Sequence, residues 1–351
     1  MQEFFNDSPL WLSSQLVEVN WDHILEKTLP FLDEEGRELV MDRSGFKSIN
    51  PLLIVTDLVV EHMSDASSIS FSKFDIFKQK IGKRIDEWSN LLQKYDDRSI
   101  GGRVFTDSLK SKASAIKKLF KEKSDQVKSF LEKYKELLIE HVKPKLKPIV
   151  EFNSENPGNF SMTWPWLEGE AWRVGGTHYT TRNIPSALDV AESRGVCRWK
   201  YDHTCVEPST PKVTAMHSGI VTRFSRCNTR ITHSTGWATN YYHMDHLIHQ
   251  SLETVKQGDA IGQYADRYNN SICEGGRSYN AHLHFDFIDP SGRHQNLDGW
   301  EINGYKVHAG AKNYDTDCDR CYLEKKGIKY CPYRGTVKHE KWWWTTKIVN
   351  F

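Results

Sequence analysis

The sequence lacks several features that mark common classes of protein. Its formal net charge is only +1 over 351 residues, so it has no overall basic field that would attract nucleic acid or an anionic membrane. The longest apolar stretch, Pro51–Val60, contains an aspartate and is too short to span a bilayer. We therefore expect no transmembrane segment and no nucleic-acid partner.

A signal peptide is not visible either, because Met1–Leu10 has no basic start followed by an apolar run. Cysteine is absent from the first 160 residues, and all seven cysteines lie beyond residue 177. Their spread does not match paired CxxC zinc motifs and is typical of disulfides made in an oxidising compartment. We therefore expect a secreted, extracellular protein whose leader has been removed or missed.

What the N-terminal part does contain is helical periodicity. Apolar residues recur at helical spacing from Leu109 to His141. Lysines crowd the remaining positions, which favours a solvated amphipathic helix over a nucleic-acid role. Shorter helical patterns span Trp21–Leu32, Pro51–Met63 and Phe74–Leu92, so we expect this half of the chain to be α-helical.

The pattern changes after Lys143–Pro157, a polar segment with three prolines that predicts an exposed, cleavable connection. Beyond it, short runs of alternating or β-branched residues are separated by Gly, Asn and Ser, as in antiparallel strands. These runs are Lys212–Phe224, Arg230–His233, Ala238–His243 and His282–Ile288. The sequence therefore predicts an α+β protein with a helical domain over residues 1–157 and a mainly antiparallel β domain over 158–351.

Two histidines flank one leucine in AHLHFDF, residues 281–287. Side chains two apart on a strand project to the same face, so His282 and His284 can address one point. Such a pair is weak evidence alone, since most pairs of this kind lie on the surface or serve packing. The pair indicates a metal site only if further candidate ligands lie near it.

Three such candidates lie upstream. His178 and Asp189 lie in the segment Gly175–Asp189, which is rich in Gly, Thr, Asn and Pro, and a loop there could turn both toward one metal. Singly, an exposed loop histidine and a capping aspartate explain them better. His243 follows two tyrosines on an expected strand, where aromatic packing would also explain it. Zinc prefers imidazole and carboxylate ligands, and a catalytic site uses three protein ligands.

Several longer motifs carry a resemblance to a known family. RCNTRITHSTGWATNYYHMD (226–245), CEGG (273–276), AHLHF (281–285) and NYDTDC (313–318) together resemble the staphylolysin subfamily of the lysostaphin-type zinc metallopeptidases, which are glycyl-glycine endopeptidases. The resemblance covers residues 164–333 approximately, with an insertion near Cys197–Pro208. It implies that residues 158–351 form a β peptidase domain of lysostaphin type.

The resemblance also implies roles for individual residues. His178, Asp189 and His284 would bind one Zn²⁺ per chain, and His243 and His282 would be catalytic. These two histidines would assist attack of a zinc-bound water on the scissile carbonyl and move the proton. A further residue, Tyr314, matches a tyrosine thought to bind substrate or the oxyanion. The implied substrate is a peptide bond at glycine in bacterial peptidoglycan or in a Gly-rich peptide.

Most of the cysteines fit the resemblance as well. It implies the disulfides Cys227–Cys273 and Cys318–Cys331. Cys197 and Cys205, eight residues apart inside the insertion, would suit a local third bridge. Cys321 is then left over as an unpaired or buried thiol, because no second ligand pair nearby supports a zinc knuckle with Cys318.

The helical half admits two interpretations. Because staphylolysin is made with a large propeptide, residues 1–157 are expected to be a pro-region that covers the zinc site until an activating protease cuts the connection. The alternative is an unrelated helical adaptor or cell-binding module. For the whole chain, the alternative to an enzyme is a non-catalytic metallopeptidase-like module that binds cell wall or regulates another hydrolase.

Overall fold

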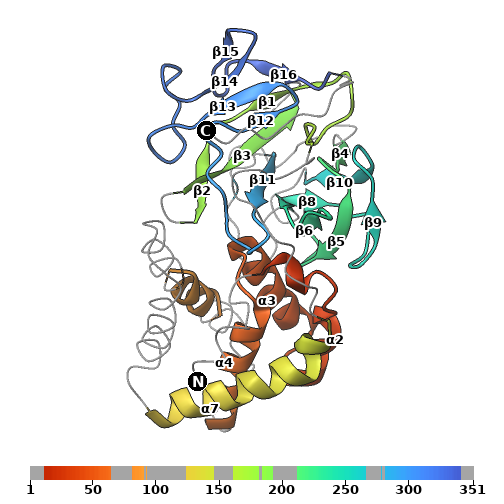
Figure 1. The fold of residues 1–351 in the computed structure, drawn as a ribbon, viewed down its shortest axis with the longest axis vertical. Coiled ribbons are helices and arrows are strands. Elements are labelled where there is room, and N and C mark those ends of the chain that lie inside the picture. The colour runs from red at the N-terminus through yellow and green to blue at the C-terminus, as the bar shows by residue number, and fades with distance from the viewer. Residues whose placement is uncertain are drawn as a thin grey trace. The chain divides into compact units, whose positions relative to one another are not determined.

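The structure is a computed structural model, and it describes residues 12–64, 81–90, 92, 124–145, 161–181, 184–192, 212–265, 278 and 281–340. The chain divides into two compact units, Met1–Pro148 and Ile149–Phe351 (Figure 1). The predicted boundary after residue 157 falls among residues 146–160, which lie outside the described residues. Each unit is considered by itself below.

The first unit is helical, as predicted. Its helices are the 3-10 helix η1 (Ser14–Leu16), α2 (Trp21–Thr28), α3 (Glu34–Lys47), α4 (Pro51–Ser64), α7 (Ser124–Leu137), the π-helix η3 (Leu138–Val142) and the 3-10 helix η4 (Lys143–Lys145). Residues 81–90 are helical as well.

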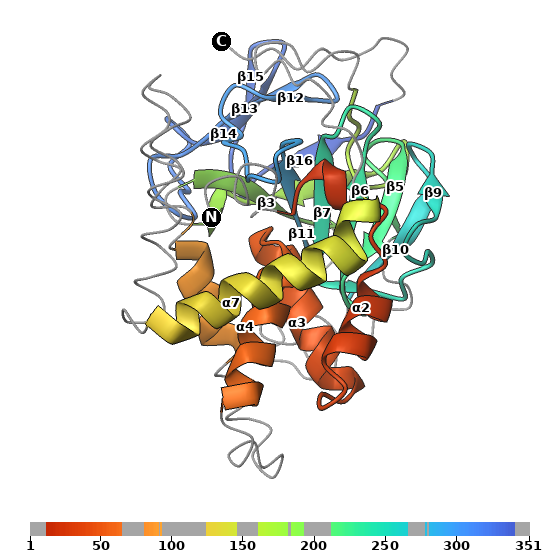
Figure 2. The same cartoon turned by 60° about the horizontal axis from the view of Figure 1, so that its bottom comes forward.

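Helix α4 forms the core of this unit, and all of its first ten residues are buried. It packs against α7 (Figure 2). The aspartate that interrupts its apolar run, Asp57, accepts hydrogen bonds from Arg84 Nε (2.5 Å) and Trp88 Nε1 (3.2 Å). The Trp88 ring also stacks on Phe130 of α7, with centroids 5.6 Å apart. A buried carboxylate is tolerated here because it is paired and hydrogen-bonded.

Two details of the helical prediction need correction. Helix α2 ends at Thr28 rather than Leu32, because Leu29 precedes a proline and is disfavoured in the helical conformation. Helix α3 was not predicted, since glycines and buried polar residues obscure its periodicity. Its start was nonetheless signalled by Asp33, whose side chain caps Gly36 N at 2.8 Å. Of the predicted helix over 109–141, residues 109–123 lie outside the described residues.

The second unit is a β domain, and every strand pair in its described residues is antiparallel. The main sheet has nine strands in the order β16-β1-β3-β11-β7-β6-β5-β9, with β2 paired to β3. Its strands are β1 (Ala171–Val174), β2 (His178–Thr181), β3 (Ile184–Glu192), β5 (Gly219–Arg223), β6 (Asn228–Thr232), β7 (Ala238–Tyr242), β9 (Thr254–Val255), β11 (Leu283–Ile288) and β16 (Thr336–Lys338).

Two smaller sheets complete this unit. One has the order β4-β10-β8 and the other β12-β13-β14-β15. Their strands are β4 (Lys212–Thr214), β8 (Met244–Asp245), β10 (Ala260–Tyr264), β12 (Glu301–Ile302), β13 (Tyr305–His308), β14 (Tyr322–Lys325) and β15 (Ile328–Tyr330). The predicted fold class, a helical region followed by a mainly antiparallel β domain, is confirmed.

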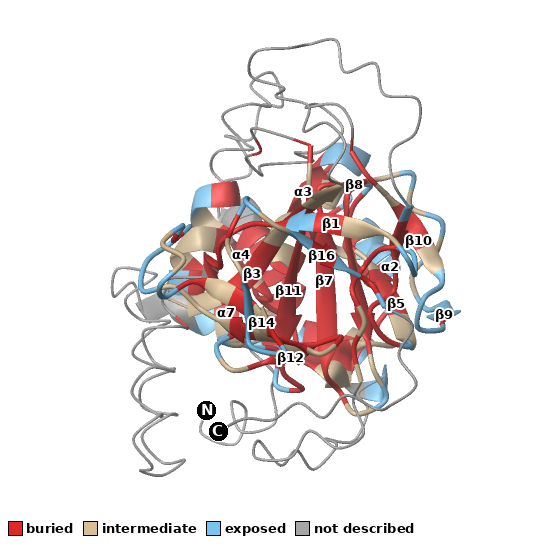
Figure 3. Ribbon diagram, turned by 90° about the horizontal axis from the view of Figure 1, so that it is seen from above, coloured by how far each residue is buried: buried red, intermediate tan, exposed pale blue. Residues whose placement is uncertain are grey.

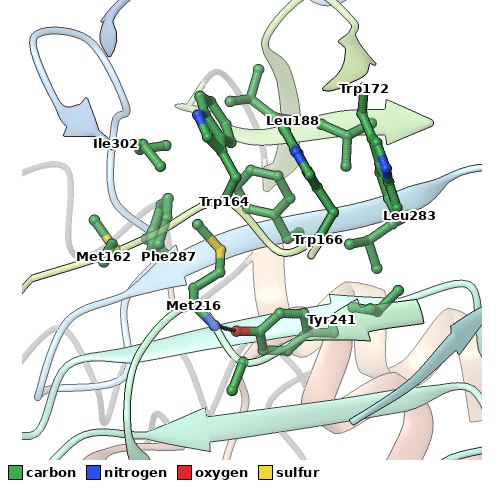
Figure 4. Packing of buried hydrophobic residues seen from close by; sticks show 14 of the residues in the cluster. Met162, Trp164, Trp166, Trp172, Leu188, Met216, Tyr241, Leu283, Phe287 and Ile302 are labelled. Atoms are coloured by element: carbon green, nitrogen blue, oxygen red, sulfur yellow. Dashed lines mark hydrogen bonds between the residues drawn. The ribbon is translucent and has the colours of Figure 1, made fainter. Parts of the chain in front are cut away.

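The core of the β unit is rich in aromatic residues. Trp164, Trp166 and Trp172 stack in a row, with successive ring centroids 5.0 Å apart. Strands β7 and β11 are buried along their whole length (Figure 3). Buried Tyr241 of β7 accepts a hydrogen bond from Met216 N at 2.8 Å (Figure 4). The central strands are therefore held rigidly from both sides, which suits them to carry a site.

The structure describes some of the seven cysteines. A disulfide joins Cys318 and Cys331, the pair implied by the family resemblance. Cys227 is disulfide-bonded, while Cys273, Cys197 and Cys205 lie outside the described residues. Cys321 is a free, buried thiol.

No helix in the described part of the chain is both long and apolar enough to cross a membrane.

Candidate metal centre

The segment expected to be a metal-binding loop is instead a hairpin of the main sheet, so that expectation is wrong. His178 opens β2, and Asp189 lies in β3, to which β2 is paired. On its other side β3 pairs with β11, and this register sets His284 directly opposite Asp189. Directly opposed residues of antiparallel strands point to the same face. Three segments that are distant in sequence therefore deliver these side chains to one point.

The potential ligand atoms of His178, Asp189 and His284 converge. His178 Nε2 lies 2.9 Å from His284 Nδ1, and each of these nitrogens lies 3.3 Å from Asp189 Oδ1. Zinc–ligand bonds of about 2.1 Å in a tetrahedron separate neighbouring ligand atoms by about 3.4 Å. His178, Asp189 and His284 are also the one group of three or more potential metal-ligand side chains found in the described residues.

The surroundings of the carboxylate fit a cation as well. Asp189 Oδ1 is buried and accepts no well-aligned hydrogen bond from the described residues, although a third imidazole nitrogen, His282 Nε2, lies 3.5 Å away. Several nitrogens around one buried oxygen, none aligned to donate to it, are the arrangement that a shared metal ion satisfies. The residues present therefore fit a metal with one carboxylate and two imidazole ligands.

The protonation of the ligands is set by burial and by neighbouring charge. Burial lowers the pKa of His178 to about 4, which keeps the ring neutral. Burial also disfavours the charged form of His284, but the carboxylates of Asp189 and Asp286 outweigh it and raise the pKa to about 9. Burial disfavours ionised Asp189 too, yet the surrounding histidines hold its pKa below the usual range. Without a metal, the protonated ring of His284 balances the carboxylate of Asp189, and a bound cation would take the place of that proton.

The two predicted catalytic histidines lie beside this cluster. The rings of His243 and His282 are 4.7 Å apart in edge-to-face contact, and the His243 ring is 6.1 Å from that of His284. Both were expected within strands, and both lie just outside them: His243 follows β7 with a positive φ of 62°, and His282 precedes β11. Non-glycine residues with a positive φ are uncommon, and they are frequently found at functional sites.

Tyr314, the predicted substrate-binding residue, also lies at the cluster. Its ring stacks on that of His178 at 4.5 Å with an interplanar angle of 9°, and 48% of the residue is exposed. Its backbone N donates to Thr177 O at 3.1 Å, and the neighbouring Asn313 accepts from Tyr179 N at 2.8 Å. The loop that carries Tyr314 is therefore fastened to the start of β2.

Sequence reasoning missed Asp286, which supports the cluster from behind. The ring of His284 donates through Nε2 to Asp286 Oδ2 at 3.3 Å. Asp286 in turn accepts from Asn240 Nδ2 at 3.0 Å, and Arg230 Nε donates to Asn240 Oδ1 at 2.6 Å. The strand register places these three side chains opposite one another across β6, β7 and β11. Such outer partners orient a metal-binding histidine and raise its basicity.

The signal for Asp286 was present in the sequence. Residues 282, 284 and 286 alternate as His, His and Asp, so an aspartate continues the histidine face of the same strand. A second residue missed from the sequence is Tyr333, which lies next to the Gly175–Gly176 turn before His178. No motif in the sequence distinguishes it from other tyrosines.

Comparisons with known proteins place the chain in a family. The model of Peptidase family M23 matches residues 203–297. The beta-lytic metalloendopeptidase of Lysobacter enzymogenes is 31% identical over 176 residues, which are 49% of this chain and 93% of that protein. The chain belongs to peptidase family M23. The resemblance deduced from sequence motifs is thereby confirmed, as is the prediction of a peptidase domain.

Two further relatives each match about half of this chain. Protease LasA of Pseudomonas aeruginosa is 36% identical over 182 residues, which cover 51% of this chain but only 41% of LasA, so the chain spans less than half of that relative. The solved structure of the deep-sea M23 metalloprotease pseudoalterin is 37% identical, covers 52% of this chain and 99% of that one, and has a TM-score of 0.47. The family model begins beyond His178 and Asp189, so the case for those two residues rests on geometry.

Proposed function

We propose that the chain is a secreted zinc metalloendopeptidase that hydrolyses peptide bonds at glycine. The observation that carries the proposal is the convergence of His178, Asp189 and His284 to within 2.9–3.3 Å. Three protein ligands of this type leave a fourth position open for catalysis, whereas structural zinc sites are closed by four protein ligands. Beside the three ligands, His243 and His282 supply groups for proton transfer.

The proposed role of each residue in catalysis follows from the position of its side chain. When bound, zinc supplies Lewis-acid polarisation of the scissile carbonyl and a water acidified to a pKa of about 7. His282 and His243 lie together beside the ligand set, where either can accept a proton from water and return it to the leaving amine. Tyr314 stands over His178, where its phenol can donate a hydrogen bond to the developing oxyanion.

For the substrate, we propose bacterial peptidoglycan cross-bridges or stem peptides. The support is the family and the names of its relatives, protease LasA and beta-lytic metalloendopeptidase. The Cys318–Cys331 disulfide supports secretion. We further propose that the helical half, residues 1–157, keeps the enzyme latent until an activating protease cuts the connection.

The deciding experiment measures zinc content and hydrolysis together. Purified protein, intact and after limited proteolysis between residues 143 and 160, is assayed on pentaglycine, purified peptidoglycans and Gly-rich proteins. We expect one zinc per chain, and a higher rate after cleavage. His217→Ala, which alters a buried histidine outside the cluster, is the matched control for His284→Ala.

Several results would contradict the proposal. A metal-free protein that still binds peptidoglycan would identify the non-catalytic module. Full activity in His284→Ala would refute the ligand assignment. Preference for Gly-rich proteins over every peptidoglycan would keep the enzyme and overturn the substrate, and equal rates before and after cleavage would overturn latency.

A further inference from the structure

The turn that leads into His178 is unusually tightly enclosed. It consists of Gly175, Gly176 and Thr177, between β1 and β2. A Cβ atom added at Gly176 would lie 2.2 Å from the backbone oxygen of Asp315, so only glycine allows the Tyr314 loop to approach this closely. One side of the turn is therefore closed by the loop that contains Asp315.

Tyr333 closes the turn at Gly175. A Cβ added there would lie 3.0 Å from Tyr333 Oη and 3.1 Å from Cε1, so the tyrosine ring lies directly against the glycine backbone. The Gly176 amide faces the Tyr333 phenol, where it counteracts the rise in the phenol pKa that burial causes, and the backbone N of Tyr333 donates to Val174 O at 2.9 Å. Tyr333 thus contacts the backbone on both sides of Gly175.

The conformation of Tyr333 indicates that this contact is specific. Its φ is +60°, which is unfavourable for an aromatic residue, and 49% of the residue remains exposed. Burial in the core therefore does not account for the strained backbone. The Cys318–Cys331 disulfide, two residues before Tyr333, links its segment to the Tyr314 loop. The two segments that enclose the turn are therefore covalently joined.

We propose that Tyr333 is a positioning residue of the metal centre, fixing the Gly175–Gly176 turn so that His178 reaches the point addressed by Asp189 and His284. The inference rests on the proposed zinc site. His178 is the first residue of β2, and its direction depends on the turn before it. Removing the phenol leaves the ligands unchanged and frees the turn that presents one of them.

The test compares two lesions of one contact. Tyr333→Phe keeps the ring and removes the phenol oxygen that lies against Gly175, while Gly175→Ala inserts a methyl group against an intact Tyr333. Tyr322→Phe, in β14 of the four-stranded sheet, is the matched control. Each full-length variant is measured for zinc affinity by competition with a chelator, for amide exchange of the 175–178 segment by mass spectrometry, and for melting temperature.

We expect Tyr333→Phe and Gly175→Ala each to raise the zinc dissociation constant by about ten-fold, the scale known for outer partners of metal ligands. The 175–178 segment should exchange faster in both, whereas Tyr322→Phe should match wild type. Adding Gly175→Ala to Tyr333→Ala should weaken zinc binding no further, because the added methyl group then meets no ring.

Other outcomes overturn the inference. Unchanged zinc affinity in Tyr333→Phe refutes the positioning role, even if exchange accelerates. Weaker zinc binding with unaltered exchange at 175–178 shows that Tyr333 acts by another route. If wild-type protein binds no zinc, the proposed function fails with it, whereas failure of the Tyr333 inference alone leaves a wild-type protein that binds zinc normally.

Discussion

Two pairs of histidines in the same β unit have opposite chemical situations. His178 and His284 approach ring to ring at 4.8 Å, and His217 and His233 do so at 5.8 Å. His217 is as deeply buried as the first pair, and burial lowers its pKa to about 3. Its Nδ1 donates to Ser218 O, which leaves Nε2 to accept from the Thr239 hydroxyl at 2.8 Å. Both ring nitrogens of His217 are thus already used.

The first pair differs because carboxylates surround it. Asp189 Oδ1 lies 3.3 Å from one nitrogen of each ring, and Asp286 accepts from the outer nitrogen of His284, which leaves the inner nitrogen directed at the shared point. A histidine that is only buried, such as His217, therefore serves packing. His284 is a potential metal ligand because neighbouring strand positions supply a carboxylate on each side of its ring. Four substitutions test this distinction, beginning with the strongest expected effect.

His284→Ala should weaken zinc binding by more than about 100-fold, the upper range for outer partners, because it removes a ligand itself. Hydrolysis should fall to background. His217→Ala should keep one zinc per chain and cost about 1–3 kcal/mol of unfolding free energy, since buried partners lose a hydrogen bond. Elemental analysis and denaturant unfolding measure the two effects. Equal zinc loss in both variants would erase the distinction between the pairs.

His243→Ala should lower kcat by about 10²–10⁴-fold, the usual contribution of general acid–base catalysis. Zinc content should stay at the wild-type level, because His243 lies beside the ligand set. His233→Ala, which alters a member of the other pair, should leave kcat nearly unchanged. Steady-state kinetics with zinc analysis on the same samples separates the roles, and loss of zinc from His243→Ala would show that it is a ligand.

Asp286→Asn should raise the zinc dissociation constant by about 10–100-fold, because a neutral amide replaces the carboxylate that orients His284. The matched control is Asp57→Asn, which alters the buried carboxylate of the helical unit beside Arg84. That variant should lose stability and keep its zinc affinity. Chelator competition provides the measurement. Wild-type affinity in Asp286→Asn would mean that Asp286 serves packing alone.

Asp315→Asn should have the smallest effect, acting through the loop that carries Tyr314. Arg320, 2.7 Å away, is the main cause that lowers the pKa of Asp315 to about 2. Because the folded pKa lies below the unfolded value of about 3.9, this stabilisation is present above pH 4 and is lost as the pH falls toward 2. Unfolding from pH 7 to 2 should show a weaker pH dependence in the variant. If the pH dependence of unfolding were the same in Asp315→Asn and wild type, the Asp315–Arg320 ion pair would be excluded as its source.

Much of the architecture was predictable from local patterns. Alternating residues predicted the strands that became β6, β7 and β11, and helical spacing predicted α4, because burial on one or both faces imposes these periods. Helix α3 escaped because its apolar spacing is irregular. The hairpin that carries His178 and Asp189 was not predicted because Gly, Thr, Asn and Pro are typical of loops, and β3 is kept extended by its pairing with β1, β2 and β11.

The sequence by itself determined which residue types are available: two histidines on one strand face, an upstream His and Asp, and motifs that named the family. It also contained Asp286 at the next position of that face. The convergence of these side chains was decided by tertiary structure, because antiparallel register sets Asp189 opposite His284. The same holds for Tyr333, whose contact with Gly175 joins segments more than 150 residues apart in the chain. Long-range contacts of this kind have no local sequence period, so they emerge only when the sheet is assembled.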